Sequence, residues 1–235
     1  MEIKGYDNLV FFDTETTGLE ADKNRIIELA AIRIGKAGKW QMDCFIKLPD
    51  GERIPDKISE LTHITDEMLE KNGVTEEEAA AEFSGMLMGA GNTLLIAHNA
   101  QFDLNFTAWM IARQQRPEWM KAFNAADYLD TLTIYKDRHA YPHKLANAIE
   151  TYGLSEKVQN THRAVDDCLA LYEVTKALQE ERSDLESYIN VFGFKNRYGI
   201  SGRELKKVTY RAQRFRDYMA PEDQTLPEII AKERS

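Results

Sequence analysis

The sequence predicts an α/β domain built on a mixed β-sheet, followed by a small C-terminal appendage. Strand-like apolar runs come first in the chain, and later runs of this kind alternate with helical patterns, which is the order expected of an α/β fold. With 235 residues and 43% apolar content, the chain can bury a sizeable core. From residue 193 a basic window replaces the alternating pattern. We therefore divide the chain into residues 1–182 and 183–235.

Hydrophobic periodicity gives the expected elements in chain order. Residues 9–12 and 93–97 are apolar runs with the length of buried strands. Residues 25–34 and 40–48 are predicted as two further strands, joined as a hairpin by a short glycine-containing link. Thr65 and Thr75 have the position of helix caps. The remaining expectations are helices near 104–112, 145–152 and 163–181, a strand-like edge at 128–132 and a loosely ordered tail.

Composition and charge argue against several classes of protein. The N-terminal residues lack a signal-peptide pattern, and no apolar run approaches the roughly 18 residues of a membrane-spanning helix, so we expect no membrane partner. Cys44 and Cys168 have no metal-ligand spacing, which favours a reduced, cytoplasmic protein. The net charge of −9 argues against a general nucleic-acid coat. It is compatible with an enzyme that meets phosphate through metal ions.

The first apolar run ends in two carboxylates, Asp13 and Glu15. Residues two apart in a strand point to the same side of the sheet, so both side chains are expected to face one way. Two like charges this close are unfavourable unless a positive charge lies between them. A divalent cation with oxygen ligands would supply it. The alternative is a strand end in solvent, with two surface acids before a turn.

Further acids follow other core elements. Asp103 lies at the start of one predicted helix and Asp167 within the last long helix, and His162 precedes that helix. Acids grouped with one histidine suit two-metal phosphodiester hydrolysis, in which two cations about 3.5–4 Å apart clamp the attacking and leaving oxygens. A histidine that titrates near neutrality can accept a proton from water.

Three motifs in this order resemble those of a known family. Asp-Thr-Glu-Thr-Thr-Gly begins at Asp13, His-Asn-Ala-Gln-Phe-Asp begins at His98, and His-Arg-Ala-Val-Asp-Asp begins at His162. Together they resemble the exonuclease motifs of the DEDDh 3′→5′ exonucleases. The nearest likeness is to the epsilon-type proofreading subunits and domains of bacterial replicative polymerases, and it covers about residues 6–180.

The resemblance implies a ribonuclease-H-like fold, with a mixed five-stranded sheet flanked by helices. It also implies the site: Asp13, Glu15, Asp103 and Asp167 would hold two Mg²⁺ or Mn²⁺ ions, with His162 as the general base. The expected substrates are single-stranded or frayed 3′ ends of DNA. Backbone amides of Thr16, Thr17 and Gly18 are implied to hold the terminal nucleotide, and His63 stands where relatives often have glycine. The residues implied to bind substrate or pack beside it are Thr14, Thr16, Thr17, Gly18, Leu19, His63, Ile64, Asn99 and Phe102.

Other chemically suggestive residues are given structural roles. Asp166 adjoins Asp167 but points about 100° away on the helix, so it is interpreted as a solvated acid. Asp130 is interpreted as a cap and His98 as a structural histidine. His139 and His143 are four apart, but Pro142 argues against a zinc-binding helix. The stripe Phe106, Trp109 and Met110 is interpreted as core.

The basic window, residues 193–216, contains eight basic residues and one acid, with four aromatic residues between them. It could track a nucleic-acid backbone, with aromatic rings stacking on bases. It could equally be a small packed appendage or a docking surface for an acidic partner, such as a DNA polymerase. Two alternatives to a DNA exonuclease stay open at this point: the same chemistry on RNA, and a polymerase-docking module on an exonuclease scaffold.

Overall fold

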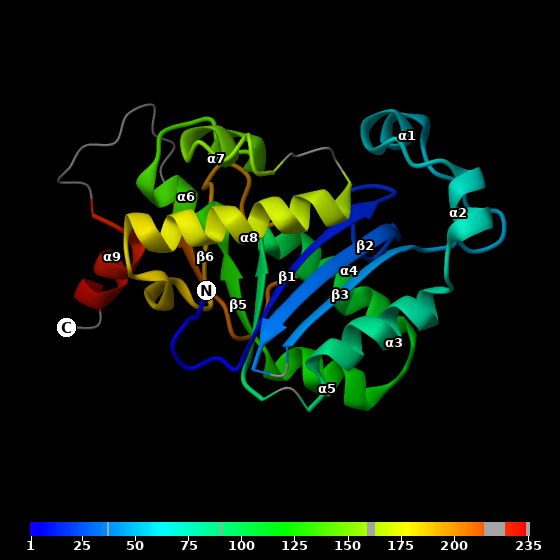
Figure 1. The fold of residues 1–235 in the computed structure, drawn as a ribbon, viewed down its shortest axis with the longest axis horizontal. Helices are drawn as coiled ribbons and strands as arrows, with labels where there is room; N and C mark the ends of the chain where they lie inside the picture. The colour runs from blue at the N-terminus through cyan, green and yellow to red at the C-terminus, as the bar shows by residue number, and fades with distance from the viewer. Residues whose placement is uncertain (37, 90, 159–162, 214–223, 234–235) are drawn as a thin grey trace.

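A computed structural model describes residues 1–235 except 37, 90, 159–162, 214–223 and 234–235. A five-stranded sheet runs through the molecule (Figure 1). Its strands are β1 (Asn8–Thr16), β2 (Ile26–Gly35), β3 (Gly38–Phe45), β4 (Thr93–Ala97) and β5 (Asp127–Asp130). Their order across the sheet is β3-β2-β1-β4-β5. β2 is antiparallel to β1 and to β3, whereas β4 and β5 run parallel to β1. The predicted mixed sheet and its hairpin are confirmed.

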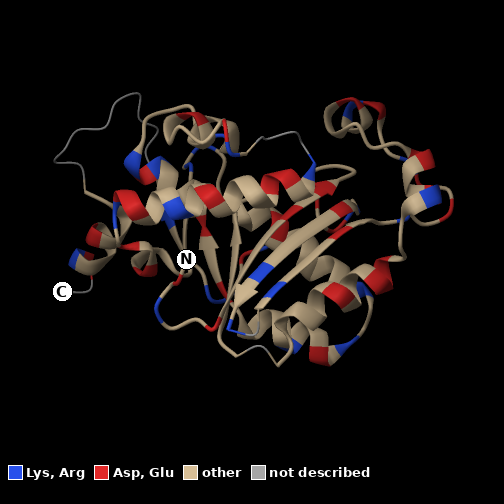
Figure 2. Cartoon of the chain, viewed as in Figure 1, with Lys and Arg blue, Asp and Glu red and all other residues tan. Residues whose placement is uncertain are grey.

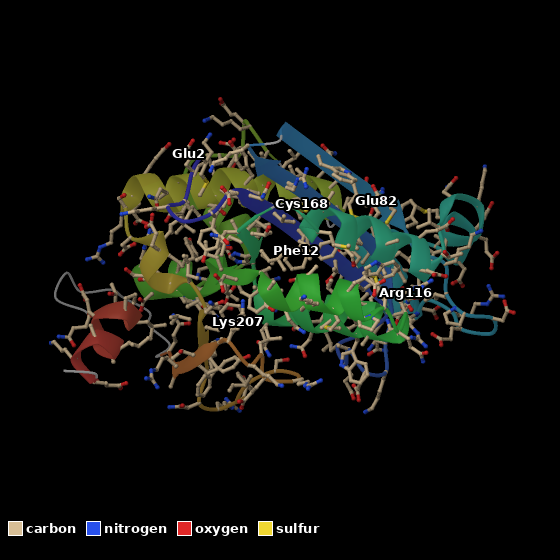
Figure 3. All side chains as sticks on the ribbon, turned by 90° about the horizontal axis from the view of Figure 1, so that it is seen from below. Glu2, Phe12, Glu82, Arg116, Cys168 and Lys207 are labelled. Carbon is tan, nitrogen blue, oxygen red and sulfur yellow. The ribbon has the colours of Figure 1, made fainter. Side chains whose placement is uncertain are left out.

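Helices cover both faces of the sheet. The helices up to Glu181 are α1 (Asp56–Thr62), α2 (Asp66–Asn72), α3 (Glu76–Leu87), α4 (Ala100–Arg113), α5 (Pro117–Ala125), α6 (Thr131–Arg138), α7 (Leu145–Thr151) and α8 (Ala164–Glu181). Of these, α1 and α2 project beyond the sheet (Figure 1). α8 packs on β1 and β2. In Figure 3, α8 and α4 lie on opposite sides of the sheet, and Phe12 lies between them. The sheet is therefore the middle layer of three.

Successive residues of β1 serve opposite layers. Val10 and Phe12 join the core cluster beneath α3 and α4, whereas Leu9 and Phe11 join the cluster beneath α8. All four side chains are buried, as expected for a strand covered on both faces. The apolar run at residues 9–12 therefore reflects a central strand, and it places the carboxylates of the next residues between two packed layers.

Several helices begin at residues that the sequence marks as caps. The Thr65 side chain accepts a hydrogen bond from the Met68 amide, 3.3 Å away, at the start of α2. Thr75 and Glu78 form a reciprocal capping box at the start of α3. The Asp130 side chain caps α6 through the amides of two following residues, so its interpretation as a cap is confirmed.

The segment after α8 adds η1 (Leu185–Tyr188), the short parallel pair β6 (Val191–Phe194) and β7 (Thr209–Ala212), and α9 (Leu226–Glu233). Phe192 belongs to the cluster beneath α3 and α4. Leu185, Tyr188, Leu226 and Ile230 belong to the cluster beneath α8. The expectation of a loosely ordered tail is wrong for residues 226–233, because a helix there buries two apolar side chains one turn apart.

Other local predictions were inaccurate. β5 ends at Asp130, because that residue caps α6, so the strand-like edge does not reach residue 132. α1 and α5 were not predicted. Trp109 is 37% exposed, whereas Phe106 and Met110 are buried as expected. Trp109 lines a cavity of about 530 Å³ between α4, α5 and residues 203–207. Among the described residues, no helix combines the length and apolar character needed to span a membrane.

Candidate active site

Three carboxylates from two elements meet near the carboxyl end of β1. Asp13 and Glu15 lie on β1, and Asp167 lies in the first turn of α8. One oxygen from each of these three carboxylates lies within 4.8 Å of the others. Figure 2 shows acidic residues both on the first turn of α8 and on the strands beneath it. The fold therefore brings together two segments that are more than a hundred residues apart in the chain.

Asp103 approaches this group from the first turn of α4. Its Oδ1 accepts two hydrogen bonds from Thr14, one from the amide at 3.1 Å and one from the hydroxyl at 2.7 Å. Thr14 lies between Asp13 and Glu15 on β1, and both Thr14 and Asp103 are buried. Thr14 therefore fixes the position of the fourth acid relative to the first two, a role that the sequence analysis did not give it.

Burial and mutual repulsion raise the pKa values of the clustered carboxylates. Burial, together with repulsion from Asp103, Asp167 and Glu15, raises the pKa of Asp13 well above its usual range. Burial and neighbouring carboxylates raise the pKa of Glu15 to about 8. Burial raises the pKa of Asp103 to about 7, although its bonds to Thr14 oppose the shift. Protons or cations must neutralise such a group at neutral pH.

A fifth acid beside the cluster is neutralised within the chain. Glu28 of β2 pairs with Glu15 in the sheet register and is fully buried. Its Oε1 accepts hydrogen bonds from the Arg163 guanidinium at 2.9 and 2.8 Å, and its Oε2 accepts one from the Ala164 amide at 3.1 Å. This pair ties the start of α8, and hence Asp167, to the middle of the sheet. The sequence analysis missed Glu28, although Arg163 stood inside a quoted motif.

The donor set fits a hard divalent cation. The carboxylates offer oxygen ligands only and are close enough to share an ion, and they repel one another, although Arg163 offsets part of this repulsion at Glu15. His162, the predicted base, lies outside the described residues, so its position is not part of this geometry.

Comparison with known proteins connects this geometry to one family. The family profile described as Exonuclease (RNase_T) matches residues 10–175, which include all four acids. The DNA polymerase III subunit epsilon of Treponema pallidum is 35% identical over 165 residues, which are 68% of this chain and 73% of that protein. This chain belongs to the exonuclease family. The predicted family and its exonuclease activity are thereby confirmed.

Other similar proteins are much longer than this exonuclease. A PolC-type DNA polymerase III of Thermotoga maritima is 33% identical over 171 residues, and the match covers 72% of this chain but 12% of that protein. The crystal structure of E. coli exonuclease I with a dA16 oligonucleotide shares the fold, with a TM-score of 0.66 at 20% identity, over 77% of this chain and 42% of that chain.

The turn after β1 in this exonuclease is closed by its own hydrogen bonds. The Thr17 amide donates to the Arg25 carbonyl at 2.9 Å, so it is not free to hold a nucleotide as the resemblance implied. The Thr16 hydroxyl donates to the Gly18 carbonyl at 2.6 Å. A side chain at Gly18 would collide with Asn24, because an added Cβ would lie 2.6 Å from Asn24 Oδ1. Leu19 follows with 81% of its surface exposed.

The segment around His63 lies between α1 and α2, which project beyond the end of β1 in Figure 1. His63 ends α1 in the left-handed region, with φ 59°. Glycine is the residue best suited to that conformation. The His63 side chain is exposed, but Ile64 is fully buried against Ile27, Ile54 and Leu69. Ile64 therefore anchors this segment through buried apolar contacts and has no exposed surface that could contact a ligand.

The second motif places two further predicted residues near Asp103. Asn99 is exposed and precedes α4 in the left-handed region, with φ 76°, and its amide donates to Asp130 Oδ1 at 2.9 Å. Phe102 is half-buried and packs on Phe106, with ring centroids 4.7 Å apart. Both residues lie on the same turn as Asp103, and Asn99 can face a ligand.

The nearby histidines are engaged by their surroundings. His98 Nε2 lies 3.0 Å from the His143 carbonyl, and His98 Nδ1 lies 3.0 Å from the Thr131 hydroxyl. Burial lowers the pKa of His98, so the ring stays neutral at pH 7. Its structural interpretation is confirmed. His143 Nε2 bonds the backbone carbonyl of His139, which lies just after α6.

Proposed function

We propose that this chain is a metal-dependent 3′→5′ exonuclease that acts in the cytoplasm on single-stranded or frayed 3′ ends of DNA and releases nucleoside 5′-monophosphates. The observation that carries the proposal is the meeting of Asp13, Glu15 and Asp167 within 4.8 Å, with Asp103 held beside them by Thr14. DNA is supported by the relatives, one named as a DNA polymerase III subunit epsilon and one solved with a dA16 oligonucleotide.

Two Mg²⁺ or Mn²⁺ ions are proposed to be held by Asp13, Glu15, Asp103 and Asp167. When bound, such ions activate the attacking water and neutralise charge that develops on the scissile phosphate. Oxygen-only ligands favour Mg²⁺ or Mn²⁺ over zinc, which prefers nitrogen and sulfur. Activity should therefore be lost on chelation and restored by either ion.

The chain's own residues supply position and proton transfer. Thr14 holds Asp103, and the Glu28–Arg163 pair holds the first turn of α8. His162, one residue before Arg163, is proposed to accept the proton of the attacking water. Its protonation should remove activity at low pH.

Exposed side chains around the acids are proposed to receive the terminal nucleotides. Leu19, His63 and Asn99 are exposed and follow β1, α1 and β4, respectively. An apolar side chain and an imidazole can pack on base faces, and an exposed carboxamide can bond to sugar or phosphate. These contacts do not depend strongly on base identity, which suits an enzyme that removes any 3′ residue.

The deciding experiment is hydrolysis of matched 5′-labelled DNA and RNA oligonucleotides with Mn²⁺, by wild type, Asp13→Asn and His162→Ala. We expect stepwise shortening of DNA from the 3′ end by wild type and loss of it in both variants. Faster shortening of RNA would replace the DNA assignment with an exoribonuclease. Absence of cleavage of either polymer, together with capture of a DNA polymerase, would favour a docking module. Unchanged rates in both variants would contradict the proposed roles.

A further inference from the structure

The helix that carries Asp103 is attached on its other side to the C-terminal segment. Gln101 and Asn105 stand two residues before and after Asp103 on α4. At about 100° per residue, both point roughly opposite to Asp103. Their side chains are polar but only 8% and 5% exposed, respectively. Buried amides of this kind require partners, because an unpaired amide in the interior is costly.

Residues 201–210 supply these partners, apart from the Gln101 carbonyl, which accepts a hydrogen bond from Asn105 Nδ2 at 2.8 Å within α4. Gln101 Nε2 donates to the carbonyls of Ser201 at 2.8 Å and Arg203 at 2.9 Å. Gln101 Oε1 accepts a hydrogen bond from the Tyr210 hydroxyl at 2.8 Å, and the same hydroxyl accepts one from the Leu205 amide at 2.8 Å. Gln101 thus joins both ends of this stretch to one turn of α4.

Asn105 makes the second attachment one turn further along α4. Its Nδ2 donates to the Arg203 carbonyl at 3.1 Å, and its Oδ1 accepts from the Arg203 amide at 2.9 Å. Gly202 permits this approach, since its φ is +70° and an added Cβ would lie 3.1 Å from Asn105 Cγ. The side chains of Gln101 and Asn105 thus both form hydrogen bonds with the backbone at Arg203.

Residues 201–210 also contact the rest of the domain outside α4. Lys207 Nζ donates to the carbonyls of Ala125 and Ala126 at 2.9 and 2.8 Å. Tyr210 packs edge-on against Phe192, which belongs to the core. In Figure 3, Lys207 lies on the side of α4 away from α8. Asp103 and this stretch thus lie on opposite sides of one helix.

We propose that residues 201–210 form a brace that sets the position of α4 and thereby of Asp103, with Gln101 as the positioning residue. This inference rests on the proposed function of Asp103 as a metal ligand. The family match ends at residue 175, before the brace begins. Gln101 occupies a position of the second motif to which the sequence analysis gave no role. This part of the basic window would then support the active site through α4, from the side of the helix opposite to Asp103, by backbone and tyrosine contacts.

The test compares brace variants with a matched control in the 235-residue chain. Tyr210→Phe removes the hydroxyl that links Gln101 and Leu205 but keeps the ring. Gln101→Glu keeps the size of the side chain but removes the donor to two carbonyls. Tyr188→Phe is the control, because it removes a buried hydroxyl of the C-terminal segment that bonds Asp137, far along the chain from α4. If Gln101→Glu does not fold, Tyr210→Phe carries the comparison.

Manganese affinity without substrate and kcat for a single-stranded DNA oligonucleotide are the readouts, with thermal stability measured beside them. Both brace variants are expected to weaken Mn²⁺ binding and lower kcat by about two- to thirtyfold, with KM for DNA unchanged. Tyr188→Phe should lower stability alone. Brace variants that lose stability but keep wild-type Mn²⁺ affinity and kcat would overturn the inference. A wild type without Mn²⁺ binding or DNA hydrolysis would overturn the proposed function and this inference with it.

Discussion

Asp13 and Asp130 stand near the carboxyl ends of the parallel strands β1 and β5, yet their surroundings differ completely. Asp130 is buried and accepts five hydrogen bonds, from the amides of Asn99, Ala100, Leu132 and Thr133 and from the Thr133 hydroxyl. Among the described residues, none donates a hydrogen bond to the Asp13 carboxylate, and burial and four other carboxylates raise its pKa. One acid is stabilised by the fold, whereas the other is left to be stabilised by a ligand.

This difference separates a structural acid from a functional one without reference to motifs. A buried carboxylate with a complete set of donors contributes to stability. A carboxylate that lies among other carboxylates and accepts no hydrogen bond lowers stability until a cation binds. Active-site residues are often in such an unfavourable environment. Substitution of Asp13, substitution of Asp130 and the pH dependence of stability test whether the two acids divide their roles in this way. A fourth test, at His63, concerns a proposed substrate contact.

Asp13→Asn should have the largest effect on activity. Removing one ligand of the proposed ion pair should lower kcat by at least about 1000-fold, since ion-mediated stabilisation of the transition state is worth several kcal/mol. The metal-free variant should also be more stable than wild type at pH 8, because one charge of the cluster is gone. Rates of 3′-end hydrolysis and thermal melting in EDTA measure the two effects. A variant that keeps its activity would place Asp13 with Asp130 as a structural acid.

Asp130→Ala should have the largest effect on stability. It leaves four amides at the start of α4 and α6 without an acceptor, so we expect a loss of about 3 kcal/mol in the free energy of unfolding. Urea unfolding measures this loss. Asp22→Ala, at an exposed acid, is the control and should change stability little. An Asp130 variant as stable as wild type would remove the contrast between the two acids.

The metal-free protein should lose stability as the pH rises from about 4.5 to 8. The pKa of Glu15 is raised from 4.5 to about 8 and that of Asp103 to about 7, so the folded chain binds more protons than the unfolded chain in this window. Stability therefore falls with increasing pH. Saturating Mg²⁺ should remove the fall, because cations replace the protons. Melting temperatures from pH 5 to 8.5, with EDTA or Mg²⁺, test this. A flat EDTA profile would show that the charges are balanced within the chain.

His63→Gly should have the smallest effect. His63 adopts φ 59°, a conformation that disfavours residues with a Cβ, so glycine should raise the free energy of unfolding by about 1 kcal/mol. Glu60→Gly, within α1, is the control and should lower it. A parallel rise in KM for DNA would show that the imidazole contacts substrate. Stabilisation without any change in KM would leave Leu19 and Asn99 as the proposed contacts.

The parts of the fold that could be predicted are those in which a short stretch of sequence is sufficient to indicate the structure it forms. Buried runs gave β1 and β4, and Thr65 and Thr75 marked two helix starts. The acids of β1 were recognised because strand spacing puts Asp13 and Glu15 on one side. Asp130 was recognised as a cap, but its helix was missed because the apolar residues around it suggested a continuing strand.

The parts that were missed depend on contacts between distant residues. Nothing near Glu28 indicates that a guanidinium from residue 163 will neutralise it. Nothing near Gln101 indicates that carbonyls a hundred residues later will accept its hydrogen bonds. α9 is short, and its burial depends on the surface formed by η1 and α6. Whether residue 182 divides two functional units stays a prediction that deletion of residues 183–235 would test.

The Glu28–Arg163 pair also bears on when the enzyme becomes active during synthesis. A nascent chain that has not yet reached residue 163 has Asp13, Glu15 and Asp103 but no α8, so its central strands lack one covering layer. Because domains fold as units once their elements are available, the active site would form only after α8 has left the ribosome. Incomplete translation products would then carry the acids without the ability to degrade nucleic acid.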